Sequence, residues 1–175
     1  MSKDHRKWAW AWYALSGALV VLDQVVKGVV RSTMTLGESR PFIPHFIELY
    51  YVENTGAAFS LFNEHTWLLA LLSALVTVAL VLCLWKDWFS GDAFSRLCLA
   101  LALAGAAGNL IDRAGMGAVT DMFNFTFMRF GVFNVADICV VGGVIGYAAW
   151  LLFTQFKPAP KGEGEEHGVD ADSPQ

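Results

Sequence analysis

The sequence predicts an all-α membrane protein with four transmembrane helices and a small extracytoplasmic β-like subdomain between the first and second helices. Its composition is 55% hydrophobic and 16% charged, with a mean hydropathy of +0.46, whereas soluble domains carry about 25% charged residues. The apolar residues fall into four long blocks, each near the roughly 20 residues that a helix needs to cross a bilayer. A length of 175 residues suits one domain.

The four predicted spans are residues 8–30, 67–85, 94–111 and 133–156. The first block follows a basic start, as a cleaved secretory signal would. Its apolar run, however, continues past Asp23 without a convincing small-x-small cleavage site. We therefore interpret it as a retained span.

The connection at residues 31–66 is long enough to form a small subdomain of its own. Its stretch at 42–51 mixes Pro, Ile, Phe and Tyr with polar residues, a composition typical of short strands at the membrane surface. Tyr50 and Tyr51 suit the aromatic belt at a membrane interface. Two roles are open for this surface: grip on a lipid or an extended peptide, or simple packing against the bilayer.

Lysine and arginine near the span ends predict the orientation, because cytoplasmic connections are enriched in these residues. They occur at the N-terminus, in the second connection and in the C-terminal flank (Lys3, Arg6, Lys7, Lys86, Arg96, Lys157 and Lys161). Both termini should therefore be cytoplasmic, with the first and third connections outside. Arg113 and Arg129 in the third connection weaken this bias.

Residues 1–156 form the predicted four-helix domain, and residues 157–175 form a tail rich in Pro, Gly, Glu and Asp. The tail has two basic and five acidic residues, so it supplies −3 of the formal net charge of −4. Such a segment cannot bury enough apolar surface to order itself, and we expect a disordered cytoplasmic end. No basic stripe indicates a nucleic-acid partner.

The three cysteines, Cys83, Cys98 and Cys139, lie inside apolar blocks and lack the C-x-x-C spacing of metal or redox sites. We expect each to be a buried free thiol. The four histidines are scattered along the chain, so we expect no metal site.

Polar residues within the apolar blocks are the strongest functional signal, because an ionisable group in a span is costly and marks a functional site by default. By the predicted topology they gather at one depth, near the outer surface. They are Asp23 and Lys27 in the first span, Asn109 and Asp112 near the third, Asp121 in the third connection, and Asn134 and Asp137 at the start of the fourth.

Purely structural roles are open for most of them. Asp23 and Lys27 have the i,i+4 spacing of a neutralising pair. Asp112 and Arg113 could cap the third helix and contact headgroups, and Asn109 could join helices. Four glycines are expected to permit close helix packing: Gly105, Gly108, Gly142 and Gly146.

Asp121 and Asp137 are harder to explain structurally, because neither has a basic partner at helical spacing. Two carboxyls in a partly dry site cannot both ionise easily, so one keeps a proton. Such a pair supplies a general acid and a general base for activating water. A proton-coupled transporter and a structural membrane subunit are the rival classes, since each also uses polar residues within spans.

Four segments resemble lipoprotein signal peptidases (signal peptidase II). They are D-Q-V-V-K at residues 23–27, N-T-G-A-A-F-S at 54–60, G-A-A-G-N-L-I-D-R at 105–113 with V-T-D at 119–121, and F-N-V-A-D-I at 133–138. Their order and spacing agree with the family over roughly residues 8–156. Met122 stands where the family usually has an aromatic residue, and Cys139 where a small or hydroxyl residue is common.

The resemblance implies roles for individual residues. The two catalytic aspartates of the family fall on Asp121 and Asp137. Positions that line or shape the substrate site fall on Asn54, Gly56, Asn109, Arg113, Asn134 and Ala136. A supporting polar set falls on Asp23, Gln24, Lys27 and Asp112.

The implied function is a membrane aspartic endopeptidase that removes signal peptides from diacylglyceryl-modified bacterial prolipoproteins, cutting before the lipidated cysteine. Its implied place is the bacterial cytoplasmic (inner) membrane, with the active site near the outer, periplasmic face. We expect prolipoprotein substrates and membrane lipid as partners, a monomeric enzyme, and no cofactor.

Overall fold

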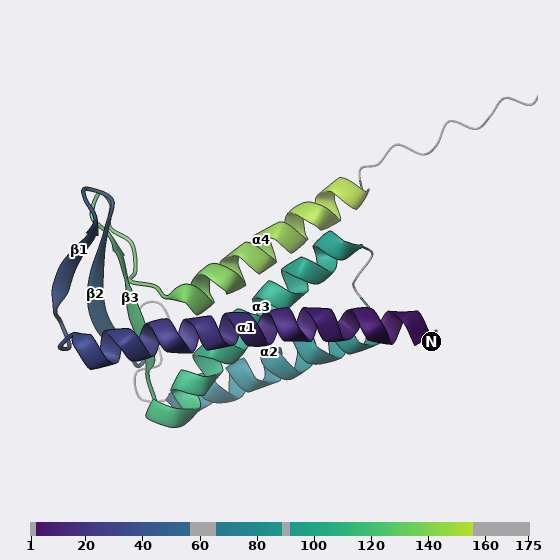
Figure 1. Ribbon diagram of the computed structural model, residues 1–175, viewed down its shortest axis with the longest axis horizontal. Coiled ribbons are helices and arrows are strands. Elements are labelled where there is room, and N and C mark those ends of the chain that lie inside the picture. Colours follow the sequence, from purple (N-terminus) through teal and green to yellow (C-terminus); the bar gives the residue numbers. More distant parts are fainter. Residues whose placement is uncertain (1–2, 57–65, 89–91, 156–175) are drawn as a thin grey trace, which may run out of the picture.

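The computed structural model describes residues 3–56, 66–88 and 92–155. This part of the chain contains four helices: α1 (Lys3–Thr33), α2 (Thr66–Lys86), α3 (Ala93–Met116) and α4 (Val135–Gln155) (Figure 1). Each is long and apolar enough to cross a membrane, which confirms the four predicted spans. The predicted disordered tail at 157–175 and residues 57–60 of the N-T-G-A-A-F-S motif lie outside the described residues.

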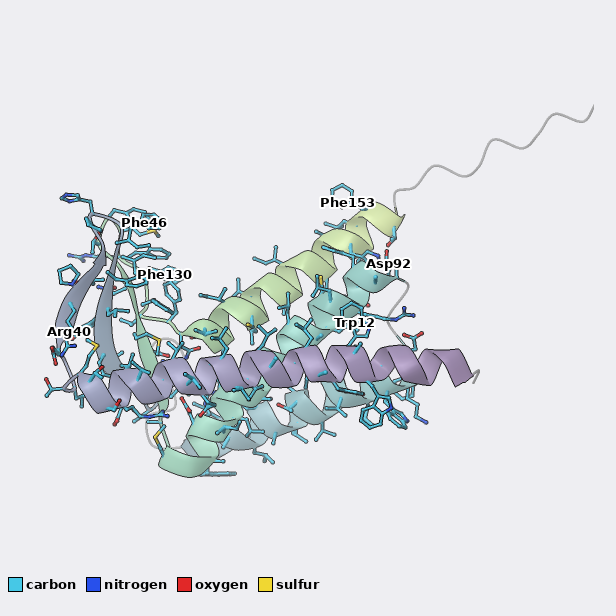
Figure 2. All side chains as sticks on the ribbon, viewed as in Figure 1. Trp12, Arg40, Phe46, Asp92, Phe130 and Phe153 are labelled. Atoms are coloured by element: carbon cyan, nitrogen blue, oxygen red, sulfur yellow. The ribbon has the colours of Figure 1, made fainter. Side chains whose placement is uncertain are left out.

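Helix α3 is the central helix of the bundle and packs against each of the other three. Of its most apolar stretch 56% is buried inside the protein, compared with 22% for α1, 6% for α2 and 17% for α4. The outer helices therefore turn apolar side chains outward, as Phe153 on α4 illustrates (Figure 2). Such faces are unfavourable in water and favourable in hydrocarbon, which agrees with a membrane-embedded bundle.

Three strands form an antiparallel sheet at one end of the bundle: β1 (Ser39–Ile43), β2 (Ile47–Asn54) and β3 (Val119–Phe125). The N-terminal end of α1 and the C-terminal end of α4 lie at the opposite end (Figure 1). The β1–β2 hairpin confirms the strands predicted in the first long connection. Strand β3 was not predicted; it pairs with β2 so that Asp121 lies opposite Val52.

The sheet is joined to α1 by a small apolar cluster. The register of β2 against β3 shifts between Leu49 and Val52, and within this irregular stretch Tyr51 is the one residue of β2 that is buried. The cluster consists of Val30, Met34, Tyr51 and Met122. The prediction that Tyr51 lies in an aromatic belt is therefore wrong, because its ring packs between the sheet and α1 instead of facing the membrane surface.

Helix α3 extends five residues beyond the predicted end and stops at Gly117, which has a left-handed φ of 72°. Glycine adopts this conformation without steric cost, as is typical where a helix terminates. Asp112 therefore lies within the last turns of α3 and is 1% exposed. The alternative that Asp112 caps the helix and contacts headgroups is wrong, because its carboxylate bonds to groups inside the bundle.

Close packing at glycine is confirmed for three of the four predicted positions. A Cβ at Gly105 would meet the Ala136 carbonyl oxygen, one at Gly108 would lie 2.7 Å from Asp23 Oδ2, and one at Gly146 would lie 2.8 Å from Cys98 Sγ. The prediction is wrong for Gly142, which has nothing within 4 Å of the added Cβ. Its neighbour Gly143, about 100° further round the helix, is the residue that faces α3.

The three cysteines are free thiols, as predicted. The prediction that all three are buried is confirmed for Cys98 and Cys139 and is wrong for Cys83, which is half-buried.

Candidate active site

Asp121 lies in β3, where the sheet meets the helical bundle, and is only 2% exposed. Each carboxyl oxygen accepts a hydrogen bond from an asparagine amide. Asn134 Nδ2 donates to Oδ1 at 2.6 Å, and Asn54 Nδ2 donates to Oδ2 at 3.1 Å. Burial, together with the nearby charge of Asp137, raises the pKa of Asp121 from its ordinary 3.8 to about 6.

Asp137 lies in the first turn of α4 and is held by a reciprocal helix cap. Asn134, just before the helix, accepts from Asp137 N through its side-chain oxygen at 2.9 Å, and Asp137 Oδ2 accepts from Asn134 N at 3.1 Å. These two bonds satisfy backbone donors that a helix start leaves unpaired. The second oxygen, Asp137 Oδ1, accepts from Asn109 Nδ2 at 2.8 Å.

Asn134 connects the two carboxyl groups. Its side chain donates to Asp121 and its backbone N–H donates to Asp137. Its Nδ2 also donates to Asn109 Oδ1 at 3.1 Å. Two acidic side chains from a strand and a helix are thereby brought into one hydrogen-bond network in which each carboxyl oxygen has a donor.

A buried ion cluster lies beneath this network. Lys27 on α1 is fully buried, and its ammonium lies 2.9 Å from Asp23 Oδ2 and 3.0 Å from Asp112 Oδ2. The expected i,i+4 pair is thus present, and Asp112 on α3 completes it. Gln24 donates to both Asp23 and Asp112, and also to the Gly108 carbonyl.

Two further site residues predicted from the sequence occupy different surroundings. The Gly56 N–H donates to Asn54 Oδ1 at 3.2 Å and so helps to orient the amide that contacts Asp121. Arg113, by contrast, is directed towards α2, where its Nη1 donates to Ser73 Oγ at 3.3 Å. Among the described contacts, Arg113 has no bond to either aspartate.

Arg31 and Thr120 belong to the cluster but were not predicted. Arg31 Nη1 donates to Thr120 Oγ1 at 3.0 Å and lies 3.7 Å from Asp112 Oδ1. Arg31 is four residues after Lys27 and therefore lies on the same face of α1 as Asp23 and Lys27. This shared face could have identified Arg31 as a member of the cluster. Thr120 lies in the V-T-D segment of the family resemblance, but nothing local in the sequence predicts its contacts, because its partners are distant along the chain.

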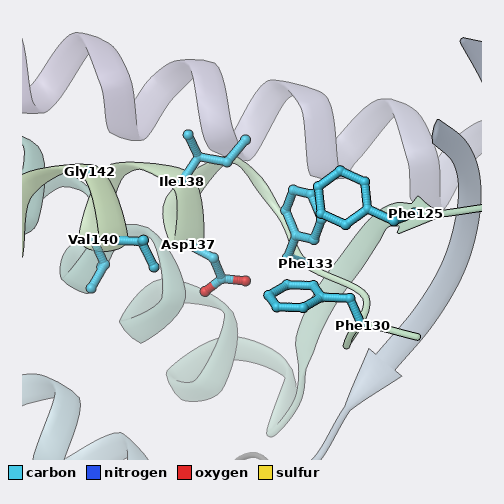
Figure 3. A pocket seen from close by; sticks show the side chains of 8 residues that line it. Phe125, Phe130, Phe133, Asp137, Ile138, Val140 and Gly142 are labelled. Carbon is cyan, nitrogen blue, oxygen red and sulfur yellow. The ribbon is translucent and has the colours of Figure 1, made fainter. Parts of the chain in front are cut away.

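An apolar pocket of about 580 Å³ opens beside Asp137. Figure 3 shows the Asp137 carboxyl beside the rings of Phe130 and Phe133, with Ile138 on the same helix. The remaining lining residues are Phe125, Val140, Val141 and Gly142. Ile138 and Val141 are both 54% exposed on the outer surface of α4. The pocket therefore extends from the Asp137 carboxyl group to the outer, apolar surface of α4.

A model of the family described as signal peptidase (SPase) II matches residues 15–153 of the chain. The chain belongs to the signal peptidase II family. The lipoprotein signal peptidase of Enterococcus faecalis is 38% identical over 152 residues, which cover 87% of this chain and 93% of that protein. The lipoprotein signal peptidase of Streptococcus pneumoniae is 40% identical over 127 residues, covering 73% and 82% respectively.

Two solved structures have a fold similar to that of this chain. A bacterial membrane enzyme determined by the in meso method at 2.3 Å resolution has a TM-score of 0.80 and 29% identity, covering 88% of this chain and 94% of its own. A second, determined at 1.9 Å, has a TM-score of 0.74 and 31% identity, covering 81% and 92%.

Signal peptidase II enzymes are aspartic peptidases that act on prolipoproteins, and this chain is accordingly a hydrolase of a bacterial membrane. Membership decides among the peptidase, the proton-coupled transporter and the structural subunit that the sequence left open.

Proposed function

We propose that the chain removes signal peptides from diacylglyceryl-modified prolipoproteins by activating water between Asp121 and Asp137. The observation that carries this proposal is the bridge through Asn134, which holds both carboxyl groups in one network. A pKa near 6 suits Asp121 to proton transfer, because a group that both gives and takes a proton works best when its pKa is near the working pH.

The chemistry divides between the two carboxyl groups. One, ionised, takes a proton from water as the water oxygen attacks the scissile carbonyl carbon. The other, protonated, donates its proton to the carbonyl oxygen, and we assign to the Asn54 amide the stabilisation of the charge that develops there. Collapse of the tetrahedral intermediate breaks the C–N bond: the leaving nitrogen takes up the proton that the first carboxyl accepted from water, and the hydroxyl proton returns to the second carboxylate as the C=O bond reforms. The two groups titrate as a unit.

The apolar pocket beside Asp137 is proposed to receive part of the diacylglyceryl group. Its lining is aromatic and aliphatic, and Ile138 and Val141 open it towards lipid. A substrate that is itself anchored in the bilayer can enter sideways through this face and keep its acyl chain in an apolar environment. Burial of apolar surface would then contribute to binding in proportion to the area removed from water.

Both termini are proposed to be cytoplasmic, with the aspartates near the outer face of the membrane. The distribution of Lys and Arg supports this orientation, and so does the placement of both helix ends away from the sheet (Figure 1). A reporter fused to the C-terminus should be active only if it is of a type that works in the cytoplasm. A periplasmic reporter signal from that fusion would reverse the orientation.

Cleavage of a purified diacylglyceryl-modified prolipoprotein tests the catalytic proposal. Asp121→Asn and Asp137→Asn should each abolish cleavage, since either change removes a proton carrier while nearly preserving shape. Asp92→Asn is a matched control, because Asp92 caps the opposite end of α3 and contacts Ser95 and Trp150 instead of the site. It should retain activity. Cleavage by either of the first two variants would remove that aspartate from the mechanism.

A further inference from the structure

The ammonium group of Lys27 lies within bonding distance of three acceptors, which is the full capacity of a lysine. Beyond Asp23 and Asp112, its Nζ donates to Asn109 Oδ1 at 3.0 Å. Among the described contacts it does not bond to either proposed catalytic carboxyl. Each of its three partners, however, makes a further bond. One bonds to Asp137 itself, and the other two bond to the backbone N–H of the residue that precedes Asp121 or Asp137.

The first of these connections sets the orientation of a side-chain amide. Lysine can only donate, so its bond to Asn109 requires the amide oxygen to face Lys27. The amide nitrogen must then face the other way, and there it donates to Asp137 Oδ1 at 2.8 Å. Lys27, with the Asn134 amide that donates to the same oxygen, therefore selects the orientation of the Asn109 amide in which a donor meets Asp137.

The second and third connections hold the backbone before each aspartate. Asp112 Oδ2 accepts from the N–H of Thr120, the residue before Asp121, at 3.1 Å. Asp23 Oδ1 accepts from the N–H of Ala136, the residue before Asp137, at 2.9 Å. Lys27 lies between these two carboxylates and contacts both, so removing it would leave buried acidic groups without their closest positive partner.

We propose that Lys27 is a positioning residue that holds Asp121 and Asp137 in their reactive arrangement through Asn109, Asp112 and Asp23. This inference rests on the proposed catalytic pair and goes beyond helix pairing. A salt bridge that only joined α1 to α3 would not need to reach the aspartates on β3 and α4, whereas the partners of Lys27 make two contacts towards Asp137 and one towards Asp121.

Lys27→Met tests the proposal, since it keeps an unbranched side chain and removes the three bonds. We expect kcat to fall by about 10- to 100-fold, because displacing a reacting group by about 1 Å can cost that much. KM should stay within about twofold, because the apolar pocket beside Asp137 is untouched. Arg96→Met is the control: it breaks the pair with Asp87 at the other end of the bundle and should leave kcat unchanged.

A pH profile gives a readout that a purely structural role would not change. The charge of Lys27 lowers the pKa of Asp121, so its removal should move the acidic limb of kcat/KM to higher pH. On the elements packed against Asp121, the charged groups at the end of the bundle that carries the sheet are Asp23, Lys27, Arg31, Glu48, Glu53, Asp112, Arg113 and Asp137, whereas Arg96 lies at the opposite end of α3. Arg96→Met changes none of them and should leave the limb in place.

A double variant covers the case in which Lys27→Met does not accumulate. Asp23→Asn with Lys27→Met removes one charge of each sign, and the new amide oxygen can still accept from Ala136. Activity is expressed per mole of folded enzyme, measured by thermal unfolding in detergent. A loss of kcat with a displaced acidic limb supports the proposal. Wild-type kcat and limb, or a lower yield of folded enzyme with normal kcat, would overturn it.

The outcome is separable from that of the proposed function. If Asp121→Asn and Asp137→Asn abolish cleavage while the Lys27 variants behave as wild type, the catalytic pair stands and the positioning role fails. If either aspartate variant still cleaves the substrate, the pair itself fails whatever the Lys27 variants do.

Discussion

Asp121→Asn should make the protein more stable near neutral pH while it removes activity. The pKa of Asp121 is raised from 3.8 to about 6 in the folded protein, so the folded state binds the proton more tightly than the unfolded state. Well below pH 3.8 both states are protonated, and this carboxyl then has no effect on the pH dependence of stability. As pH rises towards 6 the unfolded state loses its proton first, and the free energy of unfolding decreases. A difference of roughly two pKa units corresponds to about 3 kcal/mol.

Part of that gain is offset by a lost hydrogen bond. Both oxygens of Asp121 accept from amide nitrogens, of Asn134 and Asn54, and an asparagine at 121 would turn one NH2 group towards such a donor. Rotating the Asn54 amide does not help, because its oxygen accepts from Gly56 N. A buried unsatisfied donor costs about 1–2 kcal/mol. The net expectation is a gain of about 1–2 kcal/mol at pH 7.

Unfolding in mixed detergent and dodecyl sulfate micelles, followed by fluorescence of the seven tryptophans, measures this difference. The assay is run at pH 7 and at pH 4 on wild type and variant. The variant should be the more stable at pH 7 and should lose that advantage at pH 4, where the wild-type carboxyl is protonated. A variant that is less stable at pH 7, or that differs from wild type equally at both values, would refute the reasoning.

Two adjacent glycines on α4 should respond in opposite ways. Gly143→Ala should destabilise the bundle by about 1–3 kcal/mol, as overpacking does, because its Cβ would lie 2.5 Å from the Cys98 carbonyl oxygen and 2.7 Å from Ala102 N; detergent unfolding measures this, and unchanged stability would contradict it. Gly142→Leu should leave stability intact, since leucine favours helix, yet raise KM for the lipid-modified substrate about tenfold by filling the apolar pocket. An unchanged KM would separate the pocket from substrate binding.

The four helices could be predicted because each corresponds to a continuous run of about 20 apolar residues in the sequence. The second span, predicted at 67–85, runs from Thr66 to Lys86. The third extends past its apolar run to Met116, because Asp112 is polar in sequence but has its partners inside the bundle. Polarity alone indicates the end of a span only where no such partner exists.

Strand β3 and the bonds of the site depend on contacts that are distant along the chain. Val52 pairs with Asp121, and the partner strand supplies most of what makes residues 119–125 extended. Local pattern gives weak information on strands for this reason. The sequence, with the family resemblance, identified which polar residues to consider; that Asn134 contacts both aspartates, and that Lys27 contacts three acceptors, required the fold.

The site is assembled from helices that are far apart in the sequence, and this affects when it can form during synthesis. Lys27 comes from the first helix, Asn109 from the third, and Asp137 from the last, so a nascent chain on the ribosome holds only a fraction of the network. Until α4 has been translated and inserted, Asp121 lacks Asn134 and the second carboxyl is absent. With the proposed catalytic pair, hydrolysis would begin only after the final insertion step, and a truncated or stalled translation product would be inert towards neighbouring membrane proteins.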